Sequence, residues 1–139
     1  MTIEEKVEEL VSDFDLFEDW TDKYEYIISL GKELKGLELE DKIEENIVKG
    51  CQSKVWLIAN LQDGKVRFKA DSDAIISKGI IAMLIKILDN ESPETIANYN
   101  FSFIDEIGLK EHLSPNRSNG LVGMMDKIKL FAHYYTQNK

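Results

Sequence analysis

The fold is decided by residues 55–70, which read VWLIANLQDGKVRFKA. Residues 55–59 are rich in strand-forming side chains. Residues 65–70 alternate polar with apolar side chains, which is the pattern of a strand buried on one face. Residues 60–64 join the two runs. The stretch therefore predicts an antiparallel β-hairpin.

A third strand is a candidate in the charged segment from Glu38 to Val48, although its composition suits a loop equally well. The segment leads into IVKGCQS at residues 47–53, where glycine and small polar side chains predict a turn just before the hairpin. We expect a small antiparallel sheet of about three strands with this turn beside it.

Helices are predicted on both sides of the hairpin. Before it, Thr2 and Glu5 are typical of a capping box that opens a first helix. A second amphipathic helix is expected from residue 19 or 20 to about residue 35, with Gly36 as its C-cap. After the hairpin, the apolar face of residues 76–88 predicts a central core helix, capped by Ser72 or Asp73.

The last third of the chain contains two Ser-Pro pairs, and each predicts an N-cap followed by the first residue of a helix. Ser92-Pro93 opens a short helix, another short helix is expected near Phe103, and Ser114-Pro115 opens a long closing helix. The order of helices, sheet and helices indicates an α+β fold, with the small sheet packed against several helices. No linker divides the sequence, so we expect one domain over residues 1–139.

Composition disfavours several kinds of partner. The chain has 139 residues with 17 basic and 26 acidic side chains, and its formal net charge is −9. We expect no nucleic-acid partner, because phosphate contacts require clustered Lys and Arg. No apolar run approaches the ~20 residues that span a bilayer, so we expect no membrane partner. The acidic, helix-like residues 1–6 differ from a secretory signal, which favours a cytoplasmic location.

Cys51 is the only cysteine and the one obvious nucleophile. It excludes an internal disulfide and a cysteine-cluster metal site within one chain. Free cysteines are often buried and inert, but the glycine and small polar neighbours of Cys51 predict a turn in which the sulfur can be approached. Lys49 and Lys54 would favour the thiolate if their ammonium groups lie close to the sulfur.

Four stretches of the chain resemble the SufE family. GCQSKVW at residues 50–56 is similar to the family's cysteine motif, and WTDKYEYIISLG at residues 20–31 is similar to its N-terminal signature. DSDA with KG, within residues 71–79, and HLSPNRSNGL at residues 112–121 resemble the later signatures. The four follow one another with roughly the family's spacing over most of the chain. The resemblance implies a SufE/IscU-like fold.

The resemblance also implies a sulfur acceptor and carrier in iron–sulfur cluster assembly, and not an enzyme. Such a carrier takes persulfide sulfur from a SufS-type cysteine desulfurase, stimulates that enzyme and passes the sulfur to a SufBCD-type scaffold complex. Cys51 would carry the persulfide, by chemistry akin to thiol–disulfide exchange. We expect no cofactor in the carrier itself, whereas the partner desulfurase would use pyridoxal phosphate. A homodimer is left open.

Arg117 is the second candidate site residue. It lies near the start of the last predicted helix, where free backbone N–H groups favour anions. With the resemblance, we expect its guanidinium to hold the Cys51 turn or to stabilise a thiolate or persulfide. The alternative is an ordinary surface or helix-capping arginine.

Two other functions stay open at this point. An IscU-like iron–sulfur scaffold would normally present several thiolate ligands. A cysteine-dependent hydrolase would need a base for Cys51, for which His112 is the candidate, although no third partner or oxyanion motif accompanies the pair. His133 is expected to face solvent or pack. Asp71 and Asp73 are better explained as helix caps than as a metal or acid–base pair.

Overall fold

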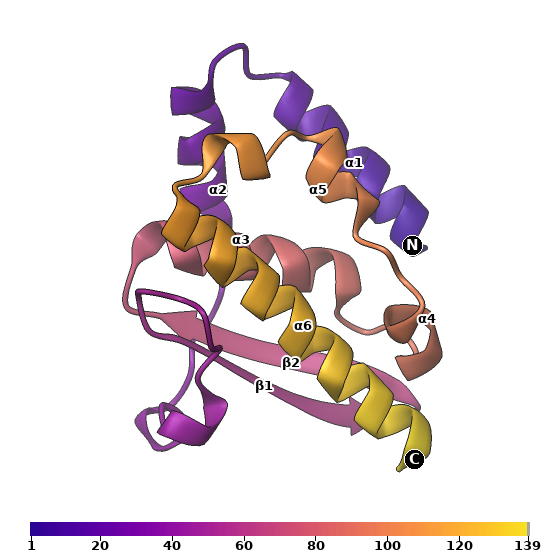
Figure 1. Ribbon diagram of the computed structural model, residues 1–139. Helices are drawn as coiled ribbons and strands as arrows, with labels where there is room; N and C mark the ends of the chain where they lie inside the picture. Colours follow the sequence, from indigo (N-terminus) through magenta and orange to yellow (C-terminus); the bar gives the residue numbers. More distant parts are fainter. Residues whose placement is uncertain (139) are drawn as a thin grey trace.

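A computed structural model, which describes residues 1–138, confirms the predicted hairpin (Figure 1). Strand β1 (Val55–Gln62) pairs antiparallel with β2 (Lys65–Ser72), so both strands extend beyond the predicted runs. Only Asp63 and Gly64 form the turn, with φ angles of 53° and 77°. Positive φ at both central residues is required for a type I′ turn, whose twist matches that of the paired strands.

Within residues 1–138 the sheet has two strands, and the third strand expected from the sequence is wrong. The preceding segment forms two 3₁₀ turns, Leu39–Asp41 and Glu44–Asn46, and meets β1 through an isolated bridge between Ile47 and Trp56. Its apolar residues stand at positions 39, 43, 47 and 48, whereas a half-buried strand needs an apolar residue at every second position. Beyond the bridge, Gly50 has a φ of 92°, which bends the chain out of strand geometry.

The outer edge of β2 is met by the loop that follows the central helix. Val66 forms an isolated bridge with Glu91. The backbone N–H of Phe68 donates to Oδ1 of Asp89 at 2.8 Å, and Arg67 Nε lies 3.1 Å from Oδ2 of the same carboxylate. This loop therefore closes against the hairpin.

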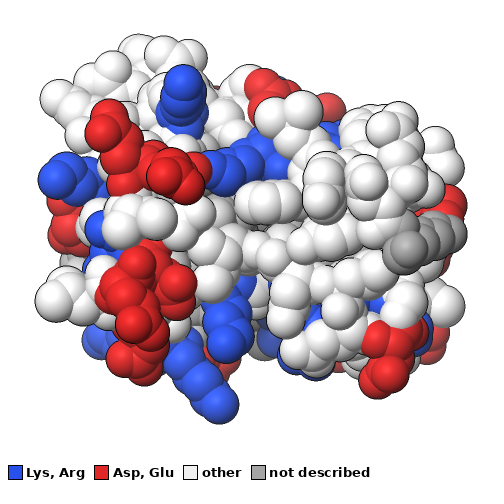
Figure 2. Space-filling view, turned by 90° about the horizontal axis from the view of Figure 1, so that it is seen from below, with Lys and Arg blue, Asp and Glu red and all other residues white. Residues whose placement is uncertain are grey.

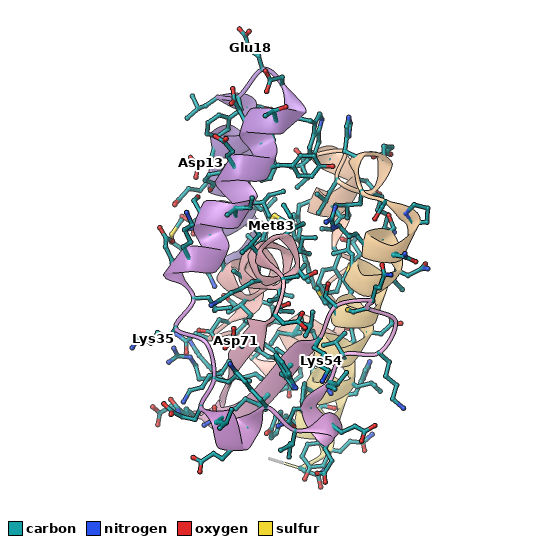
Figure 3. All side chains as sticks on the ribbon, turned by 90° about the vertical axis from the view of Figure 1, so that its left-hand side faces the viewer. Asp13, Glu18, Lys35, Lys54, Asp71 and Met83 are labelled. Carbon is teal, nitrogen blue, oxygen red and sulfur yellow. The ribbon has the colours of Figure 1, made fainter. Side chains whose placement is uncertain are left out.

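Helix α3 (Ile75–Leu88) is the predicted core helix and lies between the sheet and the N-terminal helices, as Figure 1 shows. Ten of its fourteen residues are buried, so it is surrounded on most sides. Figure 3 looks nearly along its axis, with Met83 at the centre of the molecule. Helix α2 (Trp20–Glu33) crosses it where two glycines meet, since a Cβ on Gly31 would lie 2.8 Å from the backbone nitrogen of Gly79.

The predicted helix starts are confirmed, except for that of α3. The remaining helices are α1 (Ile3–Asp15), α4 (Pro93–Ala97), α5 (Ser102–Glu106) and α6 (Pro115–Gln137), with a 3₁₀ turn at Lys110–His112. Thr2 and Glu5 form the expected capping box, and Pro93 and Pro115 are first helical residues. Helix α6 runs across the sheet, where the Tyr135 hydroxyl donates to the Ala59 carbonyl at 3.1 Å (Figure 1). None of the helices in residues 1–138 combines the length and the apolar character of a bilayer-spanning segment.

The start of α3 differs from the prediction. Ala74 occupies the N-cap position and no side chain caps the helix there. The Ser72 hydroxyl and the Asp73 N–H both donate to the Lys54 carbonyl, at 2.8 and 3.1 Å. The residues predicted as caps therefore extend the pairing of the hairpin instead.

Asp71 is also not a cap but a buried carboxylate that ties three segments together (Figure 3). It accepts hydrogen bonds from the N–H groups of Leu37 at 3.1 Å and Ser72 at 2.8 Å. The ammonium nitrogen of Lys42 lies 3.1 Å from Oδ2 of Asp71, and that of Lys78 lies 3.4 Å from Oδ1. Burial opposes ionisation of the carboxyl group, but these hydrogen bonds and cations outweigh it and lower the pKa of Asp71 to about 2.

The charged segment before the hairpin is solvated. Glu38, Glu40, Glu44 and Glu45 are all exposed on its surface. Figure 2 shows carboxylates gathered on the side of the molecule where this segment lies in Figure 1, while much of the remaining face is uncharged. The segment thus contributes surface charge and no sheet pairing beyond the bridge already described.

Candidate functional site

Cys51 lies in the turn that leads into β1, and Figure 1 shows this turn beside α6. The sulfur is half-buried, and its S–H donates to the carbonyl oxygen of Gly120 at 3.7 Å. Just before the turn, the Val48 N–H donates to the Val55 carbonyl at 2.7 Å. The turn is therefore anchored to β1 at its start and rests on α6 at its tip.

Two glycines on α6 form the seat of the turn. A Cβ on Gly120 would lie 3.0 Å from the sulfur of Cys51, and a Cβ on Gly123 would run into the carbonyl oxygen of Lys49. Glycines spaced by three share one helix face. The turn packs against helix backbone there, which a side chain at either position would prevent.

The sulfur opens into a recess of about 190 Å³ between the turn, the first turns of α3 and the first turns of α6. The lining residues are Cys51, Gln52, Ser53, Ser77, Ile80, Ser114, Asn116, Arg117, Gly120 and Met124. None of these carries a carboxylate, although the chain is strongly acidic. The polar side chains in this set are hydroxyls, amides and one guanidinium.

Side chains from the turn and from α6 meet across the recess. The Asn116 amide donates to Oε1 of Gln52 at 2.9 Å. Ser114 caps α6 by accepting the Arg117 N–H at 3.3 Å. Arg117 lines the recess, and its guanidinium makes no hydrogen bond or ion pair with residues 1–138, so it is available to a ligand or partner. Arg117 is thus brought to the same recess as Cys51.

The electrostatics of Cys51 differ from the expectation. Burial raises the pKa of the Cys51 thiol above its ordinary value, and neither flanking lysine lowers it. Lys49 instead lies near Lys127, and burial together with the charge of Lys49 lowers the pKa of Lys127. The Lys54 backbone is engaged at the end of the hairpin, where its N–H donates to Asp73. At rest the sulfur is held as a thiol.

A family model, SufE, described as an Fe-S metabolism associated domain, matches residues 8–132. The chain belongs to the SufE family. A solved structure has a similar fold, with a TM-score of 0.78 at 20% identity over 95% of this chain and 96% of that chain. It is described as the solution structure of a hypothetical protein from Thermus thermophilus.

In this SufE-family protein, neither histidine lies in the recess. The His112 ring stacks on Trp20, with centroids 3.9 Å apart and planes 13° apart, and its Nδ1 lies 2.9 Å from the Gly108 carbonyl oxygen. His133 is exposed on α6. The structure therefore assigns His112 a packing contact with α2 and does not bring it to Cys51.

Sequence reasoning missed several residues of this SufE-family site. Gly120 and Asn116 fall within the HLSPNRSNGL motif, but nothing in the motif shows what they touch. The spacing of Gly120 and Gly123 was a usable signal, because glycine costs helix stability and two on one helix face indicate close backbone approach. Ser77 gave no signal, because an isolated serine in a helix is ordinary.

Proposed function

We propose that this chain accepts sulfur as a persulfide on Cys51 from a SufS-type cysteine desulfurase and passes it to a SufBCD-type scaffold complex. One observation carries the proposal. The only cysteine lies in a turn that packs against Gly120 and Gly123 of α6, and its sulfur faces a recess that contains hydrogen-bond donors and no carboxylate. Membership of a family associated with Fe–S metabolism supports it.

The transfer is a displacement at sulfur. The Cys51 thiolate attacks the terminal sulfur of the persulfide held on the desulfurase. The sulfur–sulfur bond of the donor breaks, and the donor cysteine leaves as a thiolate. The new bond places the transferred sulfur on Cys51, with no net oxidation or reduction. Such a step needs an accessible thiolate and no cofactor in the carrier, while pyridoxal phosphate would belong to the desulfurase.

The resting structure favours storage over reaction. The thiol donates to Gly120 and burial disfavours its ionisation, so the sulfur is protected from oxidation while the carrier is free. Reaction requires the turn to leave its seat on α6. Docking on the desulfurase would supply that movement, and accepting the sulfur would free the enzyme for another cycle, which accounts for stimulation of the desulfurase.

Arg117 supports the cysteine site in this proposal. Arg117 lines the recess, and its guanidinium has no partner within residues 1–138. A positive charge at the recess that Cys51 shares would favour the thiolate as the turn opens, and later the persulfide anion. Arg117 would then stabilise the negative charge that forms on sulfur only during transfer.

Both alternative functions lack a supporting observation. A scaffold would hold its cluster through several thiolates, and this chain provides one. A hydrolase would need a base beside Cys51, and the His112 ring is stacked on Trp20 instead. The carrier function uses the single cysteine and requires no base in the chain.

The deciding experiment is incubation with a SufS-type desulfurase and free cysteine, followed by intact-mass measurement. We expect the mass of one sulfur atom, or a short chain of them, to be added and then removed by a thiol reductant. Cys51→Ser should fold and gain nothing. Equal sulfur uptake by Cys51→Ser would overturn the proposal.

A further inference from the structure

Ser77 is a buried polar residue whose hydroxyl has no partner among residues 1–138. It is 8% exposed, and its hydroxyl makes no hydrogen bond with residues 1–138. A serine in a helix can donate to a carbonyl one turn earlier, but Ser77, in the first turn of α3, does not. No fully enclosed polar side-chain atom of the described chain lacks a partner, so the Ser77 hydroxyl is not sealed in the core. The space beside it is the recess that it shares with Cys51.

The recess offers hydrogen-bond donors to a negatively charged acceptor. The Asn116 amide donates to Gln52, and the Ser114 hydroxyl accepts the Arg117 N–H as the cap of α6. The side chains of Ser53, Ser77 and Arg117 make no hydrogen bond within residues 1–138, and no carboxylate lines the recess beside them. Buried donors without partners are costly unless something binds them. The recess therefore suits a small anion.

The transferred sulfur meets this description. After transfer, the terminal sulfur of a Cys51 persulfide lies one atom beyond Sγ and carries the negative charge. We infer that the Ser77 hydroxyl donates a hydrogen bond to this terminal sulfur and retains the persulfide in the recess, an inference that rests on the function proposed above.

Ser77 suits retention because of its position on α3. Ser53 belongs to the turn that moves with Cys51, whereas Ser77 lies in the first turns of the central helix, next to the buried residues Gly79 and Ile80. A donor on a rigid element is already oriented when the charge arrives, so it loses little entropy on binding. When the turn opens toward an acceptor, the hydrogen bond breaks and the sulfur is released.

The test is the variant Ser77→Ala, which should fold because alanine is favoured in helices. Wild type and variant are loaded with inorganic polysulfide and equilibrated with glutathione, and the ratio of persulfide to thiol at Cys51 is measured by mass spectrometry. We expect the ratio to fall about tenfold in the variant, the size expected from losing a hydrogen bond to a charged group. Ser29→Ala removes a hydroxyl that donates to Tyr26 on α2 and should change nothing.

A second readout separates retention from a structural effect. The alkylation rate of the unloaded Cys51 thiol should stay within about twofold, because Ser77 makes no bond to the resting sulfur. Ser77→Thr, which keeps the hydroxyl, should retain more persulfide than Ser77→Ala. An unchanged persulfide ratio in Ser77→Ala, or equal changes in both readouts, overturns the inference while leaving the proposed function intact. A wild-type chain that takes no sulfur from the desulfurase overturns both.

Discussion

The S–H of Cys51 donates to the carbonyl oxygen of Gly120 across 3.7 Å, so the only thiol of the chain rests on the backbone of α6. A carbonyl oxygen accepts a hydrogen bond from a thiol but disfavours a thiolate, and burial adds to the cost of charge. The seat on α6 therefore stabilises the neutral, unreactive form. Lifting the turn removes both obstacles to ionisation.

The first prediction concerns the pH dependence of Cys51. Because burial raises its pKa in the folded chain, the pH midpoint of alkylation by iodoacetamide should lie higher in the folded chain than in the urea-unfolded chain. By linkage, the neutral thiol stabilises the fold at pH values below its unfolded pKa, and this contribution is lost as the pH rises through the folded value. Rate profiles of the two states measure the shift. A folded midpoint at or below the unfolded one would contradict it.

The second prediction concerns the glycine seat. In Gly120→Ala the new Cβ would lie 3.0 Å from the sulfur and must displace the turn, while alanine favours the helix by about 1 kcal/mol. We expect little change in the free energy of unfolding but several-fold faster alkylation of Cys51 at neutral pH. Val122→Ala, at an exposed position of the same helix, is the matched control. Unchanged alkylation in Gly120→Ala would show that the turn does not depend on this contact.

The third prediction concerns Gly123, which contacts the backbone of the Cys51 turn, whereas Gly120 contacts the sulfur. A Cβ at Gly123 would run into the Lys49 carbonyl oxygen, which cannot rotate away as a side chain can. Gly123→Ala should therefore lower the free energy of unfolding by roughly 1–3 kcal/mol, the usual cost of overpacking. Urea unfolding measures the change. A stability equal to that of wild type would place the turn off α6 in solution.

The fourth prediction concerns acid stability. The pKa of Asp71 is about 2, below its ordinary value of 3.8, so ionised Asp71 stabilises the fold above about pH 4, and this contribution is lost as the pH falls toward 2. Asp71→Asn should lower the free energy of unfolding by roughly 2 kcal/mol at pH 7, with the difference vanishing near pH 2. Asp63→Asn, in the exposed hairpin turn, is the control. A difference that persists unchanged at pH 2 would exclude an electrostatic cause.

The fifth prediction concerns Arg117. Its side chain is exposed and has no partner in residues 1–138, so Arg117→Ala should change the free energy of unfolding by less than about 0.5 kcal/mol. The rate of sulfur acceptance from the desulfurase should fall about tenfold, because a charged donor to the reacting sulfur is lost. Arg117→Lys should keep part of the rate. Normal acceptance by Arg117→Ala would make it an ordinary surface arginine.

Local chemistry was sufficient to predict most elements. The hairpin followed from strand-forming residues in its first strand and alternation in its second, and the Ser-Pro pairs marked the starts of α4 and α6. The sheet was overestimated because the charged segment before Cys51 has no decisive periodicity. The anchoring role of Asp71 was out of reach, because Leu37 and Lys42 are brought to it only by the tertiary fold.

The candidate site was predictable only in part. Cys51 stood out as the one nucleophile, and Arg117 was named near it from the resemblance and the helix start. The sequence suggested that Lys49 and Lys54 favour the thiolate, whereas burial raises the pKa of the Cys51 thiol. This could not be predicted, because being close in sequence does not place either lysine beside the sulfur. Ser77 reaches the recess only because α3 passes beneath the turn, and that depends on the packing of three separate segments.

The two isolated bridges at the hairpin have a consequence for the protein in a crowded cell. A two-stranded sheet has two free edges, and exposed edges invite pairing with other chains and aggregation. Here the bridge from Ile47 occupies part of one edge, and the bridge from Glu91 occupies part of the other. Charged Arg67 and Asp89 flank the second bridge. Strand addition by a neighbouring molecule would have to displace these contacts first, which protects the hairpin from self-association when the Cys51 turn beside it opens.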